Sequence, residues 1–315
     1  MPARPLLRTS YDARMAWIVI ATLGAATSFG LWSTGFIVMW PSLLHPVCGA
    51  LALYGATCFY RSVRREERLA SSCEALAQLV LFTMIAGPLS YLAAGLDRPL
   101  QDARLVHADR LMGFDWRAYL AWINAHPALH GPLRLAYDTL LPQLAAAILL
   151  LGLTGRRHQL RILVWSVIAS AVVSIAVSAI WPAVGGYAHF NLHAAAYSGI
   201  QPSDAWTHVP DFLGVRDGTL RTLALDRMQG IIAFPSFHAA LGIIFAWTYW
   251  QSPWTRWPGL AIEAALLLST PVDGAHYLSD VVAGCLLAFA SIGIAERALL
   301  TGRSRPTAAL APATR

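Results

Sequence analysis

The sequence contains very little charge. Only 13% of its 315 residues are Asp, Glu, Lys or Arg, whereas about 25% is usual in soluble domains. This scarcity excludes an ordinary soluble domain, a disordered chain and a nucleic-acid-binding protein, because each of them needs far more charge. Lysine is absent, so all 23 basic residues are arginines. We expect no nucleic-acid partner.

Cysteine is also scarce, and no cleavable leader is evident. The four cysteines are Cys48, Cys58, Cys73 and Cys285. They lack the spacing of a metal site, which excludes a cysteine-based metal centre. The length and hydrophobic composition of the chain exclude a disulfide-stapled secreted miniprotein. The first apolar run follows Arg14 and continues to Trp40, which is longer than the roughly 7–15 apolar residues of a signal peptide. We therefore expect a first helix that is retained.

What the sequence does contain is hydrophobic residues, at 57%, with a mean hydropathy of +0.52. A helix needs roughly 20 apolar residues to cross a bilayer. Eight candidate runs are present: Met15–Trp40, Ser42–Tyr60, Glu74–Leu96, Leu135–Leu153, Arg161–Ala183, Gly230–Trp250, Trp257–Asp273 and Tyr277–Arg297. The sequence therefore predicts an all-α integral membrane protein with about eight transmembrane helices.

The arginines predict the orientation, because short cytoplasmic loops accumulate basic residues. With the N-terminus inside, 15 of the 23 arginines are cytoplasmic, and the net charge is +9 inside and −3 outside. We expect a bacterial inner membrane protein with both termini in the cytoplasm. The predicted organisation is a tail with two accessory helices over residues 1–73, a catalytic membrane domain over 74–300 and a disordered cytoplasmic tail over 301–315.

Two long polar stretches, about 97–134 and 184–229, fall on the outer side. Apolar residues recur in the first of them at near-helical spacing, which predicts helices lying on the outer membrane surface. Tryptophans near the predicted interfaces are interpreted as an aromatic belt. They are Trp116, Trp122, Trp181 and Trp206.

Two segments near the outer ends of the last helices carry the candidate chemistry. One is Pro-Ser-Phe-His at 235–238, and the other runs from Gly274 to Asp280. His276 and Asp280 are four residues apart, so on a helix the carboxylate can hold one ring nitrogen and leave the other as a base or nucleophile. His238 supplies a second imidazole for proton transfer to a leaving group. Ser236 lies at a helix start, where backbone N–H groups bind anions.

Ionisable residues outside these two segments are interpreted without a catalytic role. Glu263 lies inside the seventh predicted span, where we expect an inter-helical hydrogen bond. Three outer-loop histidines are interpreted as surface or substrate-neighbourhood residues, namely His189, His193 and His208.

The two segments resemble the second and third motifs, PSGH and SR-x5-H-x3-D, of the type 2 phosphatidic acid phosphatase superfamily. Phe237 replaces the glycine and Thr270 the arginine, as in the branch of the inositol phosphorylceramide synthases and their bacterial membrane relatives, where Gly-x-His-Tyr-x-x-Asp recurs. The first motif, K-x6-RP, corresponds to Tyr91 through Arg98-Pro99, with Tyr91 in place of the lysine. The stretch that contains Asp109, Trp116 and Tyr137 is similar to bacterial members. The resemblance covers about residues 79–297.

This resemblance implies a six-helix catalytic core that works through a phosphohistidine, without a metal or another cofactor. His276 would be the nucleophile, Asp280 its orienting carboxylate and His238 the general acid. Since the lysine and one arginine of the family are absent, other arginines must bind the phosphate. The candidates are Arg98, Arg216, Arg221 and Arg227, together with Ser236.

The expected function is transfer of a phosphoryl or phospho-head group from a membrane phospholipid or lipid phosphate, as in the inositol phosphorylceramide synthases. The acceptor is either a lipid alcohol or water, and with water the protein is a lipid phosphate or polyprenyl pyrophosphate phosphatase. Three other interpretations stay open: a zinc site on His238, His276 and Asp280, a serine hydrolase built on Ser236, and a non-catalytic lipid-binding or transport protein. The oligomeric state is not indicated.

Overall fold

The computed structural model describes residues 11–193, 196–204 and 206–301. The predicted tails at 1–10 and 302–315 lie outside these residues. The helices are α1 (Tyr11–Ser33), α2 (Trp40–Ser62), α3 (Glu67–Ala94), α4 (Asp102–Leu111), α5 (Trp116–Ala125), α6 (Pro127–Asp138), α7 (Leu140–Leu153), α8 (Arg157–Ile180), α9 (Gly186–His189), α10 (Val209–Asp217), α11 (Phe237–Trp250), α12 (Arg256–Asp273) and α13 (Leu278–Thr301). Two short strands, β1 (Ile37–Val38) and β2 (Thr222–Leu223), pair in parallel.

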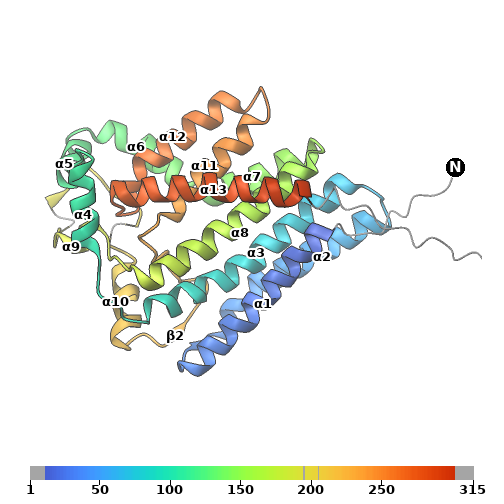
Figure 1. The fold of residues 1–315 in the computed structure, drawn as a ribbon, viewed down its shortest axis with the longest axis horizontal. Coiled ribbons are helices and arrows are strands. Elements are labelled where there is room, and N and C mark those ends of the chain that lie inside the picture. Colours follow the sequence, from blue (N-terminus) through green and yellow to red (C-terminus); the bar gives the residue numbers. More distant parts are fainter. Residues whose placement is uncertain (1–10, 194–195, 205, 302–315) are drawn as a thin grey trace, which may run out of the picture.

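The long helices lie side by side in a bundle, and the short helices α4, α5, α9 and α10 gather at one end of it (Figure 1). The described chain begins and ends at the opposite end of the bundle. Runs of Ala, Leu, Ile and Val form helices here because a helix satisfies every backbone polar group within its own segment, as a lipid environment requires. The predicted all-α architecture is confirmed.

Five helices, α1, α2, α3, α8 and α13, are long and apolar enough to cross a membrane, or six if the bent pair α6–α7 is one span. Helix α11 has only 14 residues, and α12 includes the charged Arg256, Glu263 and Asp273. The described part of the chain therefore contains a helix at each of the eight predicted places. The count of eight crossings stays a prediction.

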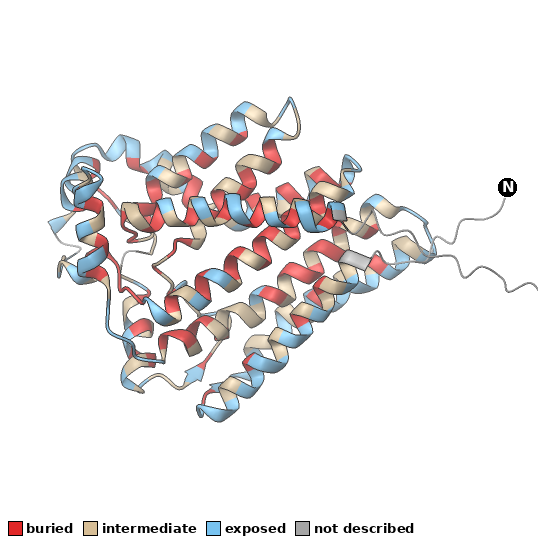
Figure 2. Cartoon of the chain, viewed as in Figure 1, coloured by how far each residue is buried: buried red, intermediate tan, exposed pale blue. Residues whose placement is uncertain are grey.

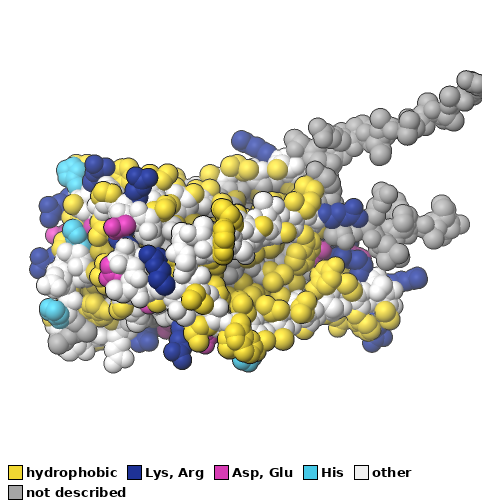
Figure 3. Space-filling view, turned by 90° about the horizontal axis from the view of Figure 1, so that it is seen from below, with side chains coloured by type: hydrophobic (Ala, Val, Ile, Leu, Met, Phe, Trp, Pro, Cys, Tyr) yellow, Lys and Arg dark blue, Asp and Glu magenta, His cyan; other side chains and the backbone are white. Residues whose placement is uncertain are grey.

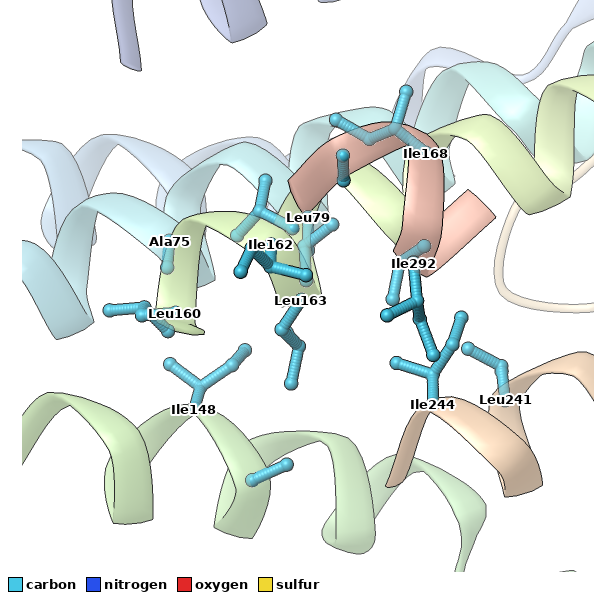
Figure 4. Packing of buried hydrophobic residues seen from close by; sticks show 14 of the residues in the cluster. Ala75, Leu79, Ile148, Leu160, Ile162, Leu163, Ile168, Leu241, Ile244 and Ile292 are labelled. Atoms are coloured by element: carbon cyan, nitrogen blue, oxygen red, sulfur yellow. The ribbon is translucent and has the colours of Figure 1, made fainter. Parts of the chain in front are cut away.

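The core lies where α3, α7, α8, α11 and α13 meet, and Figure 4 shows its aliphatic side chains pointing toward one another. Leu79, Ile148, Leu163, Ile244 and Ile292 each belong to a different one of these helices and are at most 6% exposed. Such interdigitated packing fixes the helices relative to one another, and with them the loops at their ends.

Helices α1 and α2 lie at the edge of the bundle (Figure 2). Only 11% of the apolar window of α2 is buried inside the protein, against 61% of that of α8. Large apolar side chains such as Phe29, Trp32 and Leu51 are exposed. In Figure 3 hydrophobic side chains cover the middle of one face, while arginines gather toward its two ends. This distribution is that of a protein whose apolar middle faces lipid.

Several predicted span boundaries differ from the ends of the helices. The third helix begins at Glu67 rather than Glu74. The first helix ends at Ser33 rather than Trp40, because Gly35 has a φ of +74° and the chain then enters β1. The fourth span begins in α6, which meets α7 at an angle of 54°. The sixth helix begins at Phe237 rather than Gly230. Residues 230–236 are non-helical, and four of them line the pocket described below.

The first outer polar stretch forms α4 and α5, as its periodicity predicts. Leu105, Leu120 and Ile123 are buried against the protein's own loops. The aromatic-belt interpretation of Trp116 is wrong, since this side chain is 3% exposed and lies in the same buried cluster. Trp122, in contrast, is 50% exposed.

The hydrogen bond expected for Glu263 is absent. This carboxyl group is 2% exposed, and neither of its oxygens has a hydrogen-bond partner in the described part of the chain. It faces α11 at Gly242, where a Cβ would lie 3.5 Å from Oε2. A buried polar group without a partner destabilises the folded state.

Replacing Glu263 with methionine is therefore expected to stabilise the protein by roughly 1–3 kcal/mol, the usual cost of an unpaired buried polar group. The gain should appear as a higher apparent unfolding temperature in detergent. Glu66→Met is the control, since Glu66 is exposed. A lower unfolding temperature for Glu263→Met, with Glu66→Met unchanged, would show that the carboxyl group has a stabilising partner.

Candidate active site

The structure brings the two predicted histidines together. His238 is the second residue of α11, and His276 lies in the loop between α12 and α13. Their ring centroids are 6.0 Å apart. The Ser236 backbone N–H donates to the Asp280 carbonyl oxygen at 3.1 Å, which ties the two segments together. The segments also touch at Gly284, where a Cβ would lie 2.2 Å from the Ser236 carbonyl oxygen, so only glycine fits there.

Asp280 lies beside His276, with 3.4 Å between Oδ2 and Nδ1. Both side chains are buried, at 0% and 2% exposure. The expected proximity is present, but the two groups are not aligned as a hydrogen bond, and Nδ1 has no hydrogen-bond partner in the described part of the protein. Oδ2 instead accepts from the Tyr277 backbone N–H at 2.9 Å. A small rotation of either side chain would make the bond, which is common before a substrate binds.

Trp116 holds the backbone of His276. Its indole Nε1 donates to the His276 carbonyl oxygen at 2.9 Å. On the other side of the loop, the Gly186 N–H donates to the Ala275 carbonyl at 2.9 Å. Helix α5 and the start of α9 thus fix the segment that carries His276.

Two buried aspartates, Asp102 and Asp109, support the same segment from α4. Asp109 accepts from the backbone N–H groups of Leu278 and Ser279 at 2.9 and 2.8 Å, so it caps the start of α13. Asp102 accepts from Tyr277 Oη at 2.9 Å and from the backbone N–H groups of Val184 and Gly185. Burial raises the pKa of Asp109, and the two backbone hydrogen bonds oppose this shift. Sequence reasoning did not identify Asp102.

A small pocket contains both imidazoles. It is lined by Tyr137, Gly185, Asp204, His208, Gly230, Ile231, Ile232, Ala233, His238, Gly274 and His276. Tyr137 stacks on His238, with ring centroids 4.6 Å apart and planes at 17°. Its hydroxyl donates to Asp204 Oδ2 at 3.2 Å. A Cβ at Gly274 would lie 2.7 Å from that hydroxyl and 2.8 Å from His276 Cδ2, so glycine allows the three rings to converge.

Of the two interpretations for the outer-loop histidines, His208 fits the substrate-neighbourhood one, whereas His189 and His193 are exposed. His208 is 7% exposed and lines the pocket. Its Nδ1 lies 2.9 Å from the Asp204 carbonyl oxygen, and its Nε2 lies 3.0 Å from the Val184 carbonyl oxygen. This ring therefore joins two loops that form the pocket wall. No sequence signal distinguishes it from its neighbours, because its partners are backbone atoms.

The predicted phosphate-binding residues lie outside the lining of this pocket. None of the four arginines lines the pocket. Arg98 and Arg227 are exposed. Arg216 binds Asp97 at 2.7 Å, and the Arg221 guanidinium lies 4.7 Å from the centre of the Phe36 ring. Ser236 is fully buried and caps α11, with its Oγ accepting from the Ala239 N–H at 3.2 Å.

Tyr91, in the position of the first-motif lysine, has a structural role. Its hydroxyl donates to Asp211 Oδ2 at 2.5 Å and accepts from the Gln229 N–H at 2.9 Å. Gln229 directly precedes the pocket-lining segment that starts at Gly230. Tyr91 thus fixes one wall of the pocket from a distance.

Two chemical alternatives lack a suitable arrangement. Within the described ranges, no three His, Cys, Asp or Glu side chains converge as metal ligands, so the zinc alternative has no ligand set. Ser236 Oγ is occupied as a helix cap and lies outside the pocket lining, which leaves the serine hydrolase alternative without an accessible nucleophile.

A family model of the PAP2 superfamily matches residues 103–294. The chain belongs to the PAP2 superfamily. The match includes both histidines and Asp280 and starts just after Asp102. No curated protein and no solved structure matches the chain. Membership in the PAP2 superfamily makes the protein a membrane enzyme of the phosphatase or phosphotransferase type that acts on lipid phosphates.

Burial lowers the pKa of His276 to about 4, and a backbone hydrogen bond with Ala233 opposes the shift. The imidazole is therefore neutral at pH 5.5, where an ordinary histidine with a pKa near 6.5 would be mostly protonated. If His276 is the nucleophile, the acid limb of kcat/KM is expected well below pH 6.5. Rates measured from pH 4 to 8 in detergent test this, and a half-maximal rate at pH 6.5 would contradict it.

The lowered pKa of His276 also makes the stability of the folded protein depend on pH, so stability must be measured as a control. Between pH 6.5 and about 4 the unfolded chain binds a proton at His276 that the folded chain does not bind, so this group's contribution to stability is lost as the pH falls through that range. Unfolding temperatures at each pH will separate loss of the folded state from protonation of the nucleophile.

Proposed function

We propose that this PAP2 superfamily enzyme transfers a phosphate-containing head group from a membrane phospholipid to a lipid alcohol through a phosphohistidine on His276. The observation that carries the proposal is the presence of two imidazoles, His238 and His276, whose ring centroids lie 6.0 Å apart in one pocket. One imidazole can bond to phosphorus while the other transfers a proton.

The proposed reaction has two balanced steps. In the first, a His276 ring nitrogen bonds to phosphorus, the bond from phosphorus to the lipid oxygen breaks, and His238 gives its proton to that oxygen. In the second, the acceptor hydroxyl gives its proton to His238, its oxygen bonds to phosphorus, and the phosphorus–nitrogen bond breaks. Asp280 would orient His276 and stabilise the cationic ring.

The sequence predicts that arginines bind the phosphate in the pocket. In this proposal they bind the head group outside it. Arg227 lies three residues before the pocket-lining Gly230, and its side chain is exposed. We assign Arg227 to the part of the head group that remains outside the pocket, because a guanidinium binds phosphate and hydroxyl oxygens with several donors. Arg98, also exposed, is a second candidate for that contact. Arg216 and Arg221 are the weaker candidates, given their present contacts.

The orientation is part of the proposal. The site lies at the end of the bundle opposite the described termini (Figure 1). With the termini inside, 15 of the 23 arginines fall on the side of the termini, which supports a cytoplasmic location of that side. The pocket would then face the periplasm and draw its substrates from the outer leaflet of a bacterial inner membrane.

The test is turnover by the purified protein in detergent micelles. Lipid phosphates, lipid pyrophosphates and phospholipids are offered separately, with and without a ceramide or diacylglycerol acceptor, and free phosphate and new lipids are both measured. The proposal expects a new acceptor-dependent phospholipid. Release of free phosphate without an acceptor would establish a lipid phosphatase instead. No turnover of any lipid, with lipid binding retained, would indicate a non-catalytic protein.

A further inference from the structure

Asp204 occupies an unusual position for a phosphate-handling site. It lines the same pocket as the two catalytic histidine candidates. Among the described residues that line this pocket it is the only carboxylate, and no arginine accompanies it. A negative charge in such a place opposes the binding of an anion, so its presence requires an explanation.

The structure holds this carboxylate in place from three sides. The Asp204 backbone N–H donates to the Asp273 carbonyl oxygen at 2.8 Å. Its own carbonyl oxygen lies 2.9 Å from His208 Nδ1. Its side-chain Oδ2 accepts from Tyr137 Oη at 3.2 Å. The first two contacts fix the backbone of Asp204 in the pocket wall, and the hydrogen bond from Tyr137 orients its carboxylate.

Asp204, His238 and His276 line one small pocket, so the carboxylate of Asp204 acts electrostatically on both imidazoles. When one of these rings attacks a phosphate and the other gives its proton to the leaving oxygen, that phosphate must lie close to Asp204. Within so small a pocket, a carboxylate and a bound phosphate repel each other.

The number of charges on the substrate then matters. A phosphomonoester carries between one and two negative charges near neutral pH, because its second pKa is about 6. A phosphodiester carries one. We propose that Asp204 is a specificity-determining residue that makes this pocket select phosphodiester lipids over phosphomonoester lipids. This inference rests on the proposed function and assigns to one residue the selection of its phosphodiester substrate.

The experiment compares two lipids with the same acyl chains in the same micelles, phosphatidic acid as the monoester and phosphatidylglycerol as the diester. We expect the wild type to have the higher kcat/KM for phosphatidylglycerol. Asp204→Asn removes the charge but keeps an oxygen that accepts from Tyr137. It should shift the ratio of the two kcat/KM values toward phosphatidic acid by roughly tenfold or more, as expected for removing a like charge at short range.

Two further variants make the result specific. Asp204→Glu keeps the charge and should keep the preference for the diester, so it separates charge from packing if the asparagine variant folds poorly. Asp226→Asn removes an exposed carboxylate outside the pocket lining and should leave the ratio unchanged. An unchanged ratio in Asp204→Asn, or a wild type that prefers phosphatidic acid, would overturn the inference.

Failure of the proposed function gives a different pattern. In that case His276→Ala turns over both lipids as fast as the wild type, or neither protein turns over either lipid. The affinities of the two lipids for the wild type and for Asp204→Asn then decide the inference. A diester preference that is lost in Asp204→Asn supports charge selection by Asp204, and equal affinities in the wild type overturn it.

Discussion

His276→Ala is expected to reduce turnover of the lipid substrate by roughly 10⁴-fold or more, the scale seen when a covalent nucleophile is removed. The imidazole is 2% exposed and lies in the pocket beside His238 and Asp280. His238→Ala should also lose activity, by roughly 10²- to 10⁴-fold, because a general acid contributes about that much.

The measurement is single-turnover and steady-state kinetics in micelles, with acid-labile and base-stable phosphate on the protein as the sign of a phosphohistidine. The His276→Ala variant must elute as the wild type does on size exclusion and must unfold at a similar temperature. His107→Ala is the matched control, because His107 is an exposed imidazole on α4. Turnover within tenfold of the wild type in His276→Ala would exclude His276 as the nucleophile.

The helices and the central pair of histidines could be predicted from the sequence, for a simple reason. Apolar runs report directly on helices that face lipid, and each of the eight predicted runs overlaps a helix of the structure. His276 and Asp280 are close in the chain, so their proximity is a local property. The approach of His238 follows from placing two helix ends on the same side of the membrane.

The pocket wall could not be predicted in the same way, because it is made by long-range contacts with backbone atoms. His208 and Asp204 come from a polar outer stretch in which several residues of the same types are exposed. Nothing in the composition of that stretch marks the two that turn inward. Trp116 was identified as one of several tryptophans near an interface, and its burial and its bond to the His276 carbonyl distinguish it only in the structure.

The arginines show a second limit of prediction from the sequence. A bound phosphate is expected to need a cation nearby. The sequence contains four candidates on the predicted outer side of the membrane, namely Arg98, Arg216, Arg221 and Arg227. In the structure Arg216 is neutralised by Asp97 and Arg221 lies against an aromatic ring. A sequence contains the number of charges but not which of them are already paired. The pairing decides which cations are available to a substrate.

Asp102→Ala is expected to have the second-largest effect, on stability and activity together. Asp102 is 2% exposed and accepts hydrogen bonds from Val184 N–H, Gly185 N–H and Tyr277 Oη. Alanine leaves these three buried donors without their acceptor, and each unpaired group costs about 1–3 kcal/mol. The free energy of unfolding should therefore fall by roughly 3 kcal/mol or more.

Activity should fall as well, because the donors that lose Asp102 belong to the site. Gly185 lines the pocket and Tyr277 directly follows His276, so their displacement moves the nucleophile relative to His238. Asp102→Asn provides the graded comparison, since its single oxygen can replace Oδ1, which accepts from all three donors. Unfolding temperature in detergent and kcat should both decrease in the order wild type, Asn, Ala. Asp226→Ala, at an exposed position, should change neither. If Asp102→Ala retained the kcat of the wild type, the position of His276 would not depend on this carboxylate, and the other contacts of the loop from α12 to α13, with Asp109, Trp116 and Gly186, would suffice to hold it.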